Sequence, residues 1–312
     1  MRVISLFSGA GGLDLGLIQS GNVVIWANDI DANAVATYRK NIGDHIVCAD
    51  IKDVQMKDIP DAADVVVGGF PCQGFSQANL LRDVDDDRNV LYKFFRKVIV
   101  AKKPKFFIAE NVKGILSLGG GAVIKKILAD FQRAGYRLDV HLVDMADYGV
   151  PQHRRRVIIV GQRKDMGEEF LFRFPSPTHG KMGDLQPWRT IRDELERFPD
   201  PDEPNQIVNH VYSAYKLAYR NFTGHRPTDP DKPSPTILAR GNGGGGVCAI
   251  PHYNGKRRLT IRESAAIQTF PDEFEFVGAM NSCYRQIGNA VPVRFAKSLG
   301  DELMRLGKVL VV

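Results

Sequence analysis

The 312-residue chain has few cysteines and no long apolar run. Its four cysteines, at positions 48, 72, 248 and 283, form no CxxC pair, which argues against a zinc site and against a disulfide framework. No run of roughly 18 apolar residues occurs, so no membrane-spanning helix is expected. The opening MRVISLFSGAGGLDLGL superficially resembles a secretion signal, but Asp14 and several glycines interrupt it. We therefore expect a cytoplasmic protein with reduced thiols and no metal.

Two common nucleotide-binding motifs are also missing. The glycines after the first apolar segment are spaced Gly9-x-Gly11-Gly12 and then Gly16, which does not match the G-x-G-x-x-G dinucleotide fingerprint. This disfavours a nicotinamide-dependent oxidoreductase. No lysine follows these glycines in the P-loop pattern, which disfavours phosphate transfer.

The charge balance is mildly basic. The 42 lysines and arginines exceed the 36 aspartates and glutamates, giving a net charge of +6 and a sequence pI near 9.1. Such a balance permits a polyanionic partner without requiring one. A mildly basic housekeeping enzyme is the plainer alternative.

The first half of the chain alternates strand-like and helix-like segments. Amphipathic stretches such as ANAVATYRKN and AVIKKILADFQRAG separate the apolar runs. This alternation predicts an α/β fold, with a mostly parallel sheet that carries helices on both faces. The strand candidates are RVISLF (2–7), VVIWAND (23–29), HIVCAD (45–50), ADVVVGG (63–69), KFFIAEN (105–111), LDVHLVD (138–144) and RVIIVGQ (156–162).

The alternation fades after about residue 165. Segments rich in Pro, Asp and Ser, such as FPDPDEPN and RPTDPDKPSPT, predict a smaller, loop-rich domain over residues 176–258. A helical segment within 259–280 would act as a hinge. One helix over residues 286–306 would return to the larger domain, which comprises residues 1–175 and 281–312.

Two acidic residues accompany the glycine-rich turn. Asp29 ends the second predicted strand and suits the hydroxyl groups of an adenosyl ribose, and Asp50 ends the third and would accept from an adenine amino group. The turn alone is also compatible with simple packing of a helix on a strand. With no phosphate-binding motif nearby, the combination favours S-adenosylmethionine as the ligand.

Cys72 follows the fourth predicted strand, and Glu110 lies at the end of the fifth. The stretch GGFPCQGFS places Cys72 at the carboxyl edge of the sheet, where ligands of open α/β sheets bind. A lone cysteine is either small buried packing or a nucleophile. Glu110 is either an exposed strand-end acid or a buried carboxyl group that faces the same cleft as Cys72.

A basic run, QHRRR (152–156), precedes the last predicted strand. A solvated basic turn is one interpretation. The alternation of side chains along a strand would instead direct Arg154 and Arg156 to the same side. Two inward guanidinium groups near a nucleophile indicate a site for an anion or a carbonyl group.

Together these motifs resemble the cytosine-5 DNA methyltransferase family, in its bacterial or phage type. They occur in the family's order over nearly the whole chain. One departure is Asp29 followed by Ile30, where the family commonly has glutamate and an aromatic residue. The matching segments are FSGAGGLDLG (7–16), Asp50–Ile51, GGFPCQGFS (68–76), ENV (110–112), QHRRR (152–156), LTIRESAAIQTFPD (259–272) and QIGNAVP (286–292).

The resemblance implies a Rossmann-like fold and a covalent mechanism. Cys72 would add to C6 of a flipped-out cytosine, Glu110 would hold and protonate N3, and Arg156 with Arg154 would bind O2. The implied cofactor is S-adenosylmethionine, converted to S-adenosylhomocysteine. Its implied contacts are Phe7, Ser8, Gly9, Gly11, Gly12, Leu13, Asp29, Ile30, Asp50, Ile51, Pro71, Leu91, Asn289 and Val291.

The implied partner is double-stranded DNA carrying a short specific sequence, read by the 176–258 target-recognition domain. Expected DNA contacts are Ser76, Arg88, Arg240, Lys256, Arg257 and Arg258, although the last three also fit a solvated turn. We expect a monomer in the bacterial cytoplasm, associated with the nucleoid and needing neither a membrane nor an obligate protein partner. An RNA (tRNA) cytosine-5 methyltransferase is the alternative. Intact Cys72 and Glu110 disfavour a non-catalytic DNA-binding relative.

Overall fold

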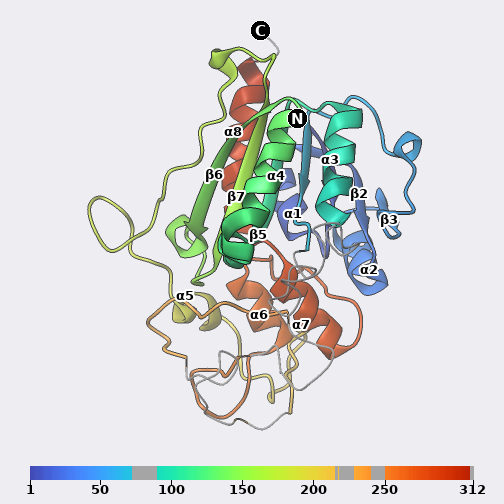
Figure 1. Cartoon of the computed structure of the whole chain (residues 1–312). Coiled ribbons are helices and arrows are strands. Elements are labelled where there is room, and N and C mark those ends of the chain that lie inside the picture. Colours follow the sequence, from blue (N-terminus) through green and yellow to red (C-terminus); the bar gives the residue numbers. More distant parts are fainter. Residues whose placement is uncertain (72–89, 215–216, 218–227, 240–249, 310–312) are drawn as a thin grey trace.

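A seven-stranded sheet forms the centre of the computed structural model, which describes residues 1–71, 90–214, 217, 228–239 and 250–309 (Figure 1). The strand order is β3-β2-β1-β4-β5-β7-β6, and all pairs are parallel except those that involve β7. Every predicted strand is confirmed. The strands are β1 (Arg2–Leu6), β2 (Val23–Asp29), β3 (Ile46–Cys48), β4 (Val65–Gly68), β5 (Phe106–Val112), β6 (Tyr136–Asp144) and β7 (Arg155–Arg163).

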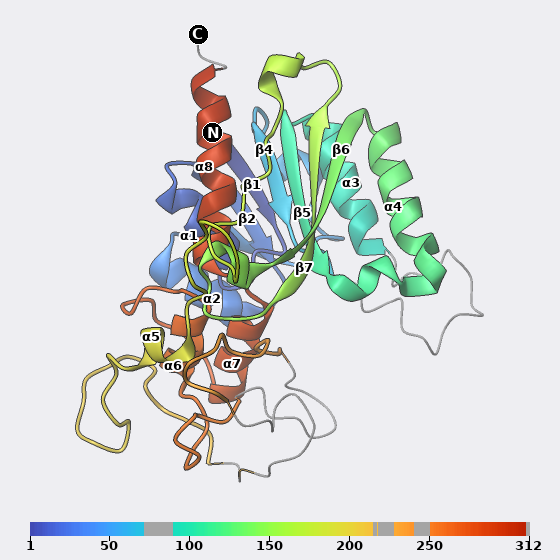
Figure 2. The ribbon, with the colours of Figure 1, turned by 90° about the vertical axis from the view of Figure 1, so that its left-hand side faces the viewer.

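Helices cover both faces of this sheet (Figure 2). Helices α1 (Gly12–Gln19) and α8 (Val293–Val309) pack side by side on one face, where Leu17 and Phe295 join the core. Helices α3 (Val90–Lys102) and α4 (Ala122–Arg133) cover the other. Burial on both sides explains why the central strands β1, β4, β5 and β7 are nearly continuous apolar runs rather than alternating ones.

The remaining helices are α2 (Ala32–Asn41), α5 (Ile191–Leu195), α6 (Ile261–Ile267) and α7 (Met280–Asn289). The single helix predicted over residues 286–306 is wrong, because α7 stops at Asn289 and α8 starts at Val293. Pro292 between them lacks an amide N–H and disfavours a helical residue before it. Short 3₁₀ helices span Met56–Asp58, Lys113–Leu116, Leu118–Gly121, Met145–Tyr148 and Glu168–Phe170.

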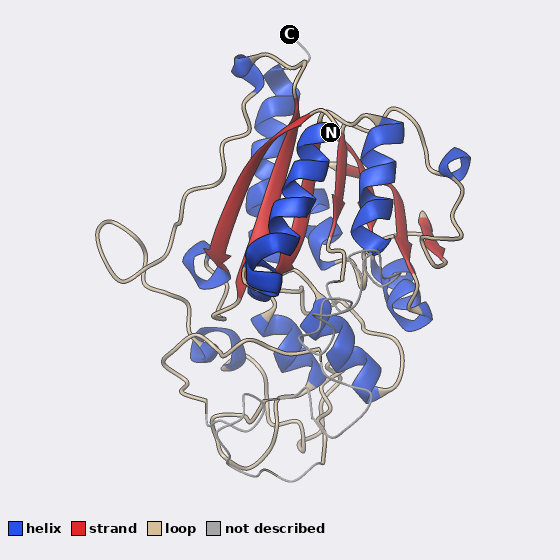
Figure 3. Cartoon of the chain, in the orientation of Figure 1, coloured by secondary structure: helices blue, strands red, loops and turns tan. Residues whose placement is uncertain are grey.

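A smaller part of the molecule, made mostly of loops, lies beyond the carboxyl ends of the parallel strands (Figure 3). Its own hydrophobic core joins α5, α6 and α7 through Ile191, Ala265 and Ile287. Helix α7, which we assigned to the larger domain, therefore packs in this second core, whereas α8 packs in the first. In the part of the chain that the structure describes, no helix has the length and apolar character that a membrane crossing requires.

Candidate functional site

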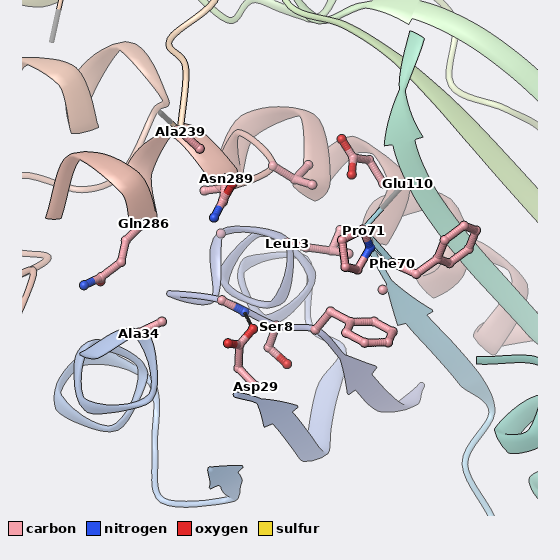
Figure 4. A pocket seen from close by; sticks show the side chains of 18 of the residues that line it. Ser8, Leu13, Asp29, Ala34, Phe70, Pro71, Glu110, Ala239, Gln286 and Asn289 are labelled. Atoms are coloured by element: carbon pink, nitrogen blue, oxygen red, sulfur yellow. Dashed lines mark hydrogen bonds between the residues drawn. The ribbon is translucent and has the colours of Figure 1, made fainter. Parts of the chain in front are cut away.

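A pocket of about 550 Å³ opens where the strand order reverses, between β1 and β4. Ligands of open α/β sheets bind at such a switch point, since the two loops that leave the neighbouring strands diverge there. The loops after β1 and β4, the end of α7 and residues 237–239 of the smaller part all contribute to its walls. Figure 4 shows Asp29 and Glu110 well apart across the pocket, with Leu13 and Pro71 between them.

Asp29 and the glycine-rich turn form one side of the pocket. The amide of Gly9 donates to Oδ2 of Asp29 at 2.7 Å, and the amide of Asp31 donates to Oδ1 at 2.8 Å. Burial raises the pKa of Asp29 in spite of these hydrogen bonds. Each carboxylate oxygen keeps a lone pair for a further donor, which suits a pair of vicinal hydroxyl groups.

Glu110 and Arg156 lie at the other side, because β7 runs against its neighbours. The reversal brings the first residues of β7 to the edge where β5 ends, and Arg156 pairs with Val112 in the ladder. Arg156 and Glu110 are thus diagonal neighbours on one face, and Nε of Arg156 lies 2.8 Å from Oε1 of Glu110. Both side chains are 13% exposed, and this partial burial strengthens the ion pair.

The loop that carries Pro71 is fixed from β5. Asn111, which is buried on the opposite face of β5 from Glu110, donates its side-chain amide to the carbonyl of Phe70 at 2.9 Å. The absence of a side chain at Gly69 leaves room for the Glu110 carboxyl group, since a Cβ there would lie 2.9 Å from Oε2. Cys72, the next residue after Pro71, lies outside the described residues.

Arg154 lines the pocket but is engaged by backbone carbonyl groups. Its guanidinium donates to the carbonyl of Ile237 at 3.2 Å and to that of Gly288 at 3.0 Å. Burial lowers the pKa of Arg154 to about 9, with the charge of Arg156 acting in the same direction and that of Glu110 opposing it. The structure therefore gives the two arginines different partners, although the sequence suggested a shared role.

A model of the C-5 cytosine-specific DNA methylase family matches residues 1–305. The chain belongs to this family. It is accordingly a DNA (cytosine-5-)-methyltransferase, and membership implies S-adenosylmethionine as methyl donor.

Curated relatives agree with this assignment. The methylase is 40% identical to the Type II methyltransferase M.NgoFVII of Neisseria gonorrhoeae, over 96% of this chain and 86% of the relative. It is 36% identical to the Type II methyltransferase M.BsuRI of Bacillus subtilis, over 97% of this chain and 79% of the relative.

Solved structures show the same fold. A prophage-encoded protein of E. coli, described as a DNA modification methyltransferase, superimposes with a TM-score of 0.76 at 26% identity, over 99% of both chains. The Dnmt2 methyltransferase of S. pombe superimposes with a TM-score of 0.71 at 21% identity, over all of both chains, and supports the fold alone.

Most of the residues expected to contact the cofactor line the methylase pocket: Phe7, Ser8, Gly9, Gly12, Leu13, Asp29, Ile30, Pro71, Asn289 and Val291. Gly11, Asp50, Ile51 and Leu91 do not. Ile51 is buried in the core and Leu91 packs against it, whereas Asp50 accepts a hydrogen bond from the amide of Lys52.

Several lining residues were not predicted from the sequence. Asp31 is the N-cap of α2, a position that Asp after a strand could have signalled, and its carboxylate pairs with Arg285 of α7 at 2.9 Å. Residues 237–239 carry no sequence signal, because they lie far along the chain from the strands that form the other walls of the pocket. The other missed positions are Ser5, Leu6, Ala34, Gly68, Gly69, Phe70, Asn111, Val112, Gln286, Gly288 and Ala290.

The three consecutive basic residues at 256–258, expected to contact DNA, differ in their exposure. Lys256 is exposed, but Arg257 and Arg258 are buried, and Arg257 forms a bidentate pair with Glu263 at 2.7 and 2.8 Å. Of these three residues, only Lys256 presents an exposed side chain, so contact of all three with DNA stays a prediction. Ser76, Arg88 and Arg240 lie outside the described residues.

A chain of buried polar side chains lies beneath the glycine-rich turn of the methylase. Asp14 is fully buried and accepts from the hydroxyl groups of Ser5 at 2.6 Å and Tyr38 at 2.8 Å. Ser8 in the pocket wall in turn donates to Oγ of Ser5 at 3.0 Å. Burial raises the pKa of Asp14 to about 6, because hydroxyl donors only partly replace the lost hydration.

This raised pKa predicts a pH-dependent contribution to stability. A carboxyl group with a raised folded-state pKa stabilises the fold below its unfolded pKa, and this stabilisation is lost as the pH rises through about 6. In Asp14→Asn the loss should be absent. The free energy of unfolding of the wild type relative to this variant should fall by about 2–3 kcal/mol between pH 4 and pH 8, as measured by chemical denaturation.

Asp53→Asn, at an exposed carboxylate, is the control and should follow the wild type at every pH. Parallel pH profiles of wild type and Asp14→Asn would contradict the assignment.

Proposed function

We propose that this methylase transfers a methyl group from S-adenosylmethionine to C5 of a flipped-out cytosine within a short specific sequence of duplex DNA. The observation that carries the proposal is the ion pair of Glu110 and Arg156, which faces the same pocket as the Asp29 carboxylate. One end of the pocket thus suits the edge of a base, and the other suits a ribose.

The described residues fit S-adenosylmethionine at the Asp29 end. Arg154 and Arg156 are the cationic side chains among the described lining residues, and both lie towards Glu110 rather than Asp29. The Asp29 end therefore lacks a cation to pair with a pyrophosphate, whereas an adenosyl group without phosphates needs none. When bound there, the cofactor supplies an electrophilic methyl group.

Glu110 and Arg156 would hold the target cytosine by its polar edge. Glu110 would hold N3 and protonate it, and Arg156 would donate to the O2 carbonyl, so that electron density would be drawn from C6. The ion pair fixes the carboxyl group before the base arrives, which lowers the reorganisation needed in the transition state. The base reaches this end of the pocket only after extrusion from the duplex.

Cys72 follows Pro71 of the pocket wall in the sequence, and its thiolate would add to C6. The new C–S bond and the proton that Glu110 gives to N3 would convert C5 into an enamine carbon, which would take the methyl group from S-adenosylmethionine and release S-adenosylhomocysteine. Transfer of the C5 proton to a base would restore the double bond between C5 and C6 and expel the thiolate, and the N3 proton would return to Glu110. The adduct would thereby make C5 more nucleophilic than it is in free cytosine.

The larger domain, residues 1–175 with 281–312, would carry this chemistry, and residues 176–258 would recognise the DNA sequence. The enzyme would act as a monomer in the bacterial cytoplasm. The names of its relatives support a role in DNA modification within a restriction-modification system.

Transfer of tritium from labelled S-adenosylmethionine to duplex DNA, followed by digestion to nucleosides, tests the proposed function. Label should be found in 5-methylcytosine, and label in any other nucleoside would reject the proposal. A parallel reaction with tRNA tests the alternative substrate, since preferential labelling of tRNA would assign the enzyme to RNA. Bisulfite sequencing of the product DNA then identifies the modified sequence.

Replacement of the proposed nucleophile tests the covalent step. Cys72→Ser should reduce methyl transfer below detection, at least a thousandfold, because a hydroxyl group is far less ionised than a thiol at neutral pH. Binding of S-adenosylmethionine, measured by calorimetry, should change less than threefold. Turnover retained by Cys72→Ser would show that another group attacks C6.

The exposed side chain of Ile30 offers a gain of affinity. Ile30 lines the pocket next to Asp29 and is 67% exposed, so its aliphatic surface gives little contact. In Ile30→Trp an aromatic ring would stack on adenine, and the dissociation constant of S-adenosylmethionine should fall about two- to tenfold. Ile30→Ala is the matched control and should bind no more tightly than the wild type. Unchanged affinity in Ile30→Trp would place adenine elsewhere.

A further inference from the structure

The segment 234–237 of the smaller part lies against the residues that precede β7. The amide of Ser234 donates to the carbonyl of Pro151 at 2.8 Å, and the amide of His153 donates to the carbonyl of Ser234 at 2.9 Å. The hydroxyl group of Thr236 donates to the carbonyl of His153 at 2.6 Å. The two segments thus form a short parallel pairing between parts of the chain far apart in sequence.

The pairing ends at Ile237, where side chains replace the backbone partners. Its amide donates to Oε1 of Gln152 at 2.8 Å, and its carbonyl accepts from Arg154 at 3.2 Å. Ile237 is 1% exposed, so both peptide groups need such partners. Gln152 and Arg154 therefore hold one residue of the pocket wall from two sides.

The same two side chains also reach the end of α7. Arg154 donates to the carbonyl of Gly288 at 3.0 Å. Gln152 donates to Gln268 of the α6 C-cap at 2.9 Å, and Gln268 donates to the carbonyl of Ile287 at 2.7 Å. The absence of a side chain at Gly288 lets the backbone of Leu238 approach the end of α7, because a Cβ on Gly288 would lie 2.5 Å from that backbone.

The cost of burying Arg154 indicates a role beyond stability. Among the described residues no carboxylate lies within ion-pair distance of its guanidinium, and its Nε has no hydrogen-bond partner. A buried charge held only by carbonyl groups is costly, and apolar packing of the same volume is often at least as stable. What the arginine adds is a rigid fork that reaches two carbonyl groups at once.

We propose that Gln152 and Arg154 are positioning residues, which fix segment 234–239 against both the start of β7 and the end of α7 and thereby set the pocket wall formed by residues 237–239. This inference rests on the proposed function of the pocket. It assigns base contact to Arg156 and a different task to Arg154. The segment continues into the part of the smaller domain expected to meet DNA. Gln152 and Arg154, here called the clamp, would therefore also set the distance between the recognised sequence and the pocket.

The test compares Gln152→Met and Arg154→Lys with Gln162→Met. Methionine keeps the volume of Gln152 without its hydrogen bonds, and lysine keeps the charge of Arg154 without its fork. Gln162 is a matched control, since it is also a buried glutamine of the β7 region with two hydrogen-bond partners, Gly167 and Phe172, at the opposite end of the strand.

Both clamp variants should lose about ten- to a hundredfold in kcat for methyl transfer, because displacement of the wall by about 1 Å misaligns the base. The dissociation constant of S-adenosylmethionine without DNA should change less than threefold. The two effects should be less than additive in the double variant, since both side chains hold Ile237. Gln162→Met should retain the kcat of the wild type.

A duplex with an abasic site at the target position separates positioning from direct base contact. A displaced smaller domain weakens binding of this duplex as much as binding of the cytosine duplex. If Arg154→Lys binds the abasic duplex as the wild type does, but the cytosine duplex more weakly, Arg154 contacts the base and the proposal is overturned. Wild-type kcat in Gln152→Met would overturn it as well.

Hydrogen–deuterium exchange supplies a readout independent of activity. Peptides that contain residues 234–239 should exchange at least tenfold faster in Gln152→Met than in the wild type, whereas Gln162→Met should leave them unchanged. Equal exchange in Gln152→Met and wild type would refute the clamp. A wild type that methylates no DNA would reject the proposed function, and the exchange result would still decide the clamp.

Discussion

The reversed direction of β7 is the constraint on which the site depends. In an all-parallel sheet the start of this strand would lie at the edge opposite the pocket, and Arg156 would be a full strand length from Glu110. Antiparallel pairing with β5 brings the two side chains to adjacent diagonal positions on one face. The ladder itself thus places the two groups, so that no flexible loop has to position either of them.

The two ends of the pocket are built by different means. At the Asp29 end, backbone amides of the glycine-rich turn and of Asp31 orient the carboxylate, and Gln286 and Asn289 come from α7 near the far end of the chain. The Glu110 end uses residues from two strands and a wall from the smaller part. Both ends therefore depend on segments that are far apart in the sequence.

The centre of the sheet could be predicted from the sequence because its central strands are buried on both faces and appear as nearly continuous apolar runs. Asp29, Glu110 and Arg156 could be found for a related reason, since a polar side chain stands out at the end of such a run, where the sheet edge meets a ligand or solvent. The direction of β7 could not be predicted, because parallel and antiparallel central strands have the same apolar composition. The break between α7 and α8 was also missed, because both segments have a helical pattern and only Pro292 marks the break between them.

The burial of three arginines shows why the rest of the site could not be predicted from the sequence. Arg154, Arg257 and Arg258 lie in basic runs that resemble solvated or phosphate-binding surface, yet all three are buried. Arg257 pairs with Glu263, which is close in the sequence. Arg154 instead donates to carbonyl groups that are 83 and 134 residues away in the sequence. Carbonyl groups are present at every residue, so no sequence pattern marks those that will accept from a guanidinium.

Arg154 and Arg156 therefore have different surroundings, although their spacing directs both side chains to the same side. Two residues apart on an extended chain, they face the same side, but only Arg156 lies within β7 beside the Glu110 carboxylate. Arg154 comes one residue before the strand begins, where the chain meets the smaller part. On the proposed roles, the motif would join reaction chemistry and domain placement within five residues, and a shift of one residue along the strand would disturb both, since it would turn the two arginines to the opposite face.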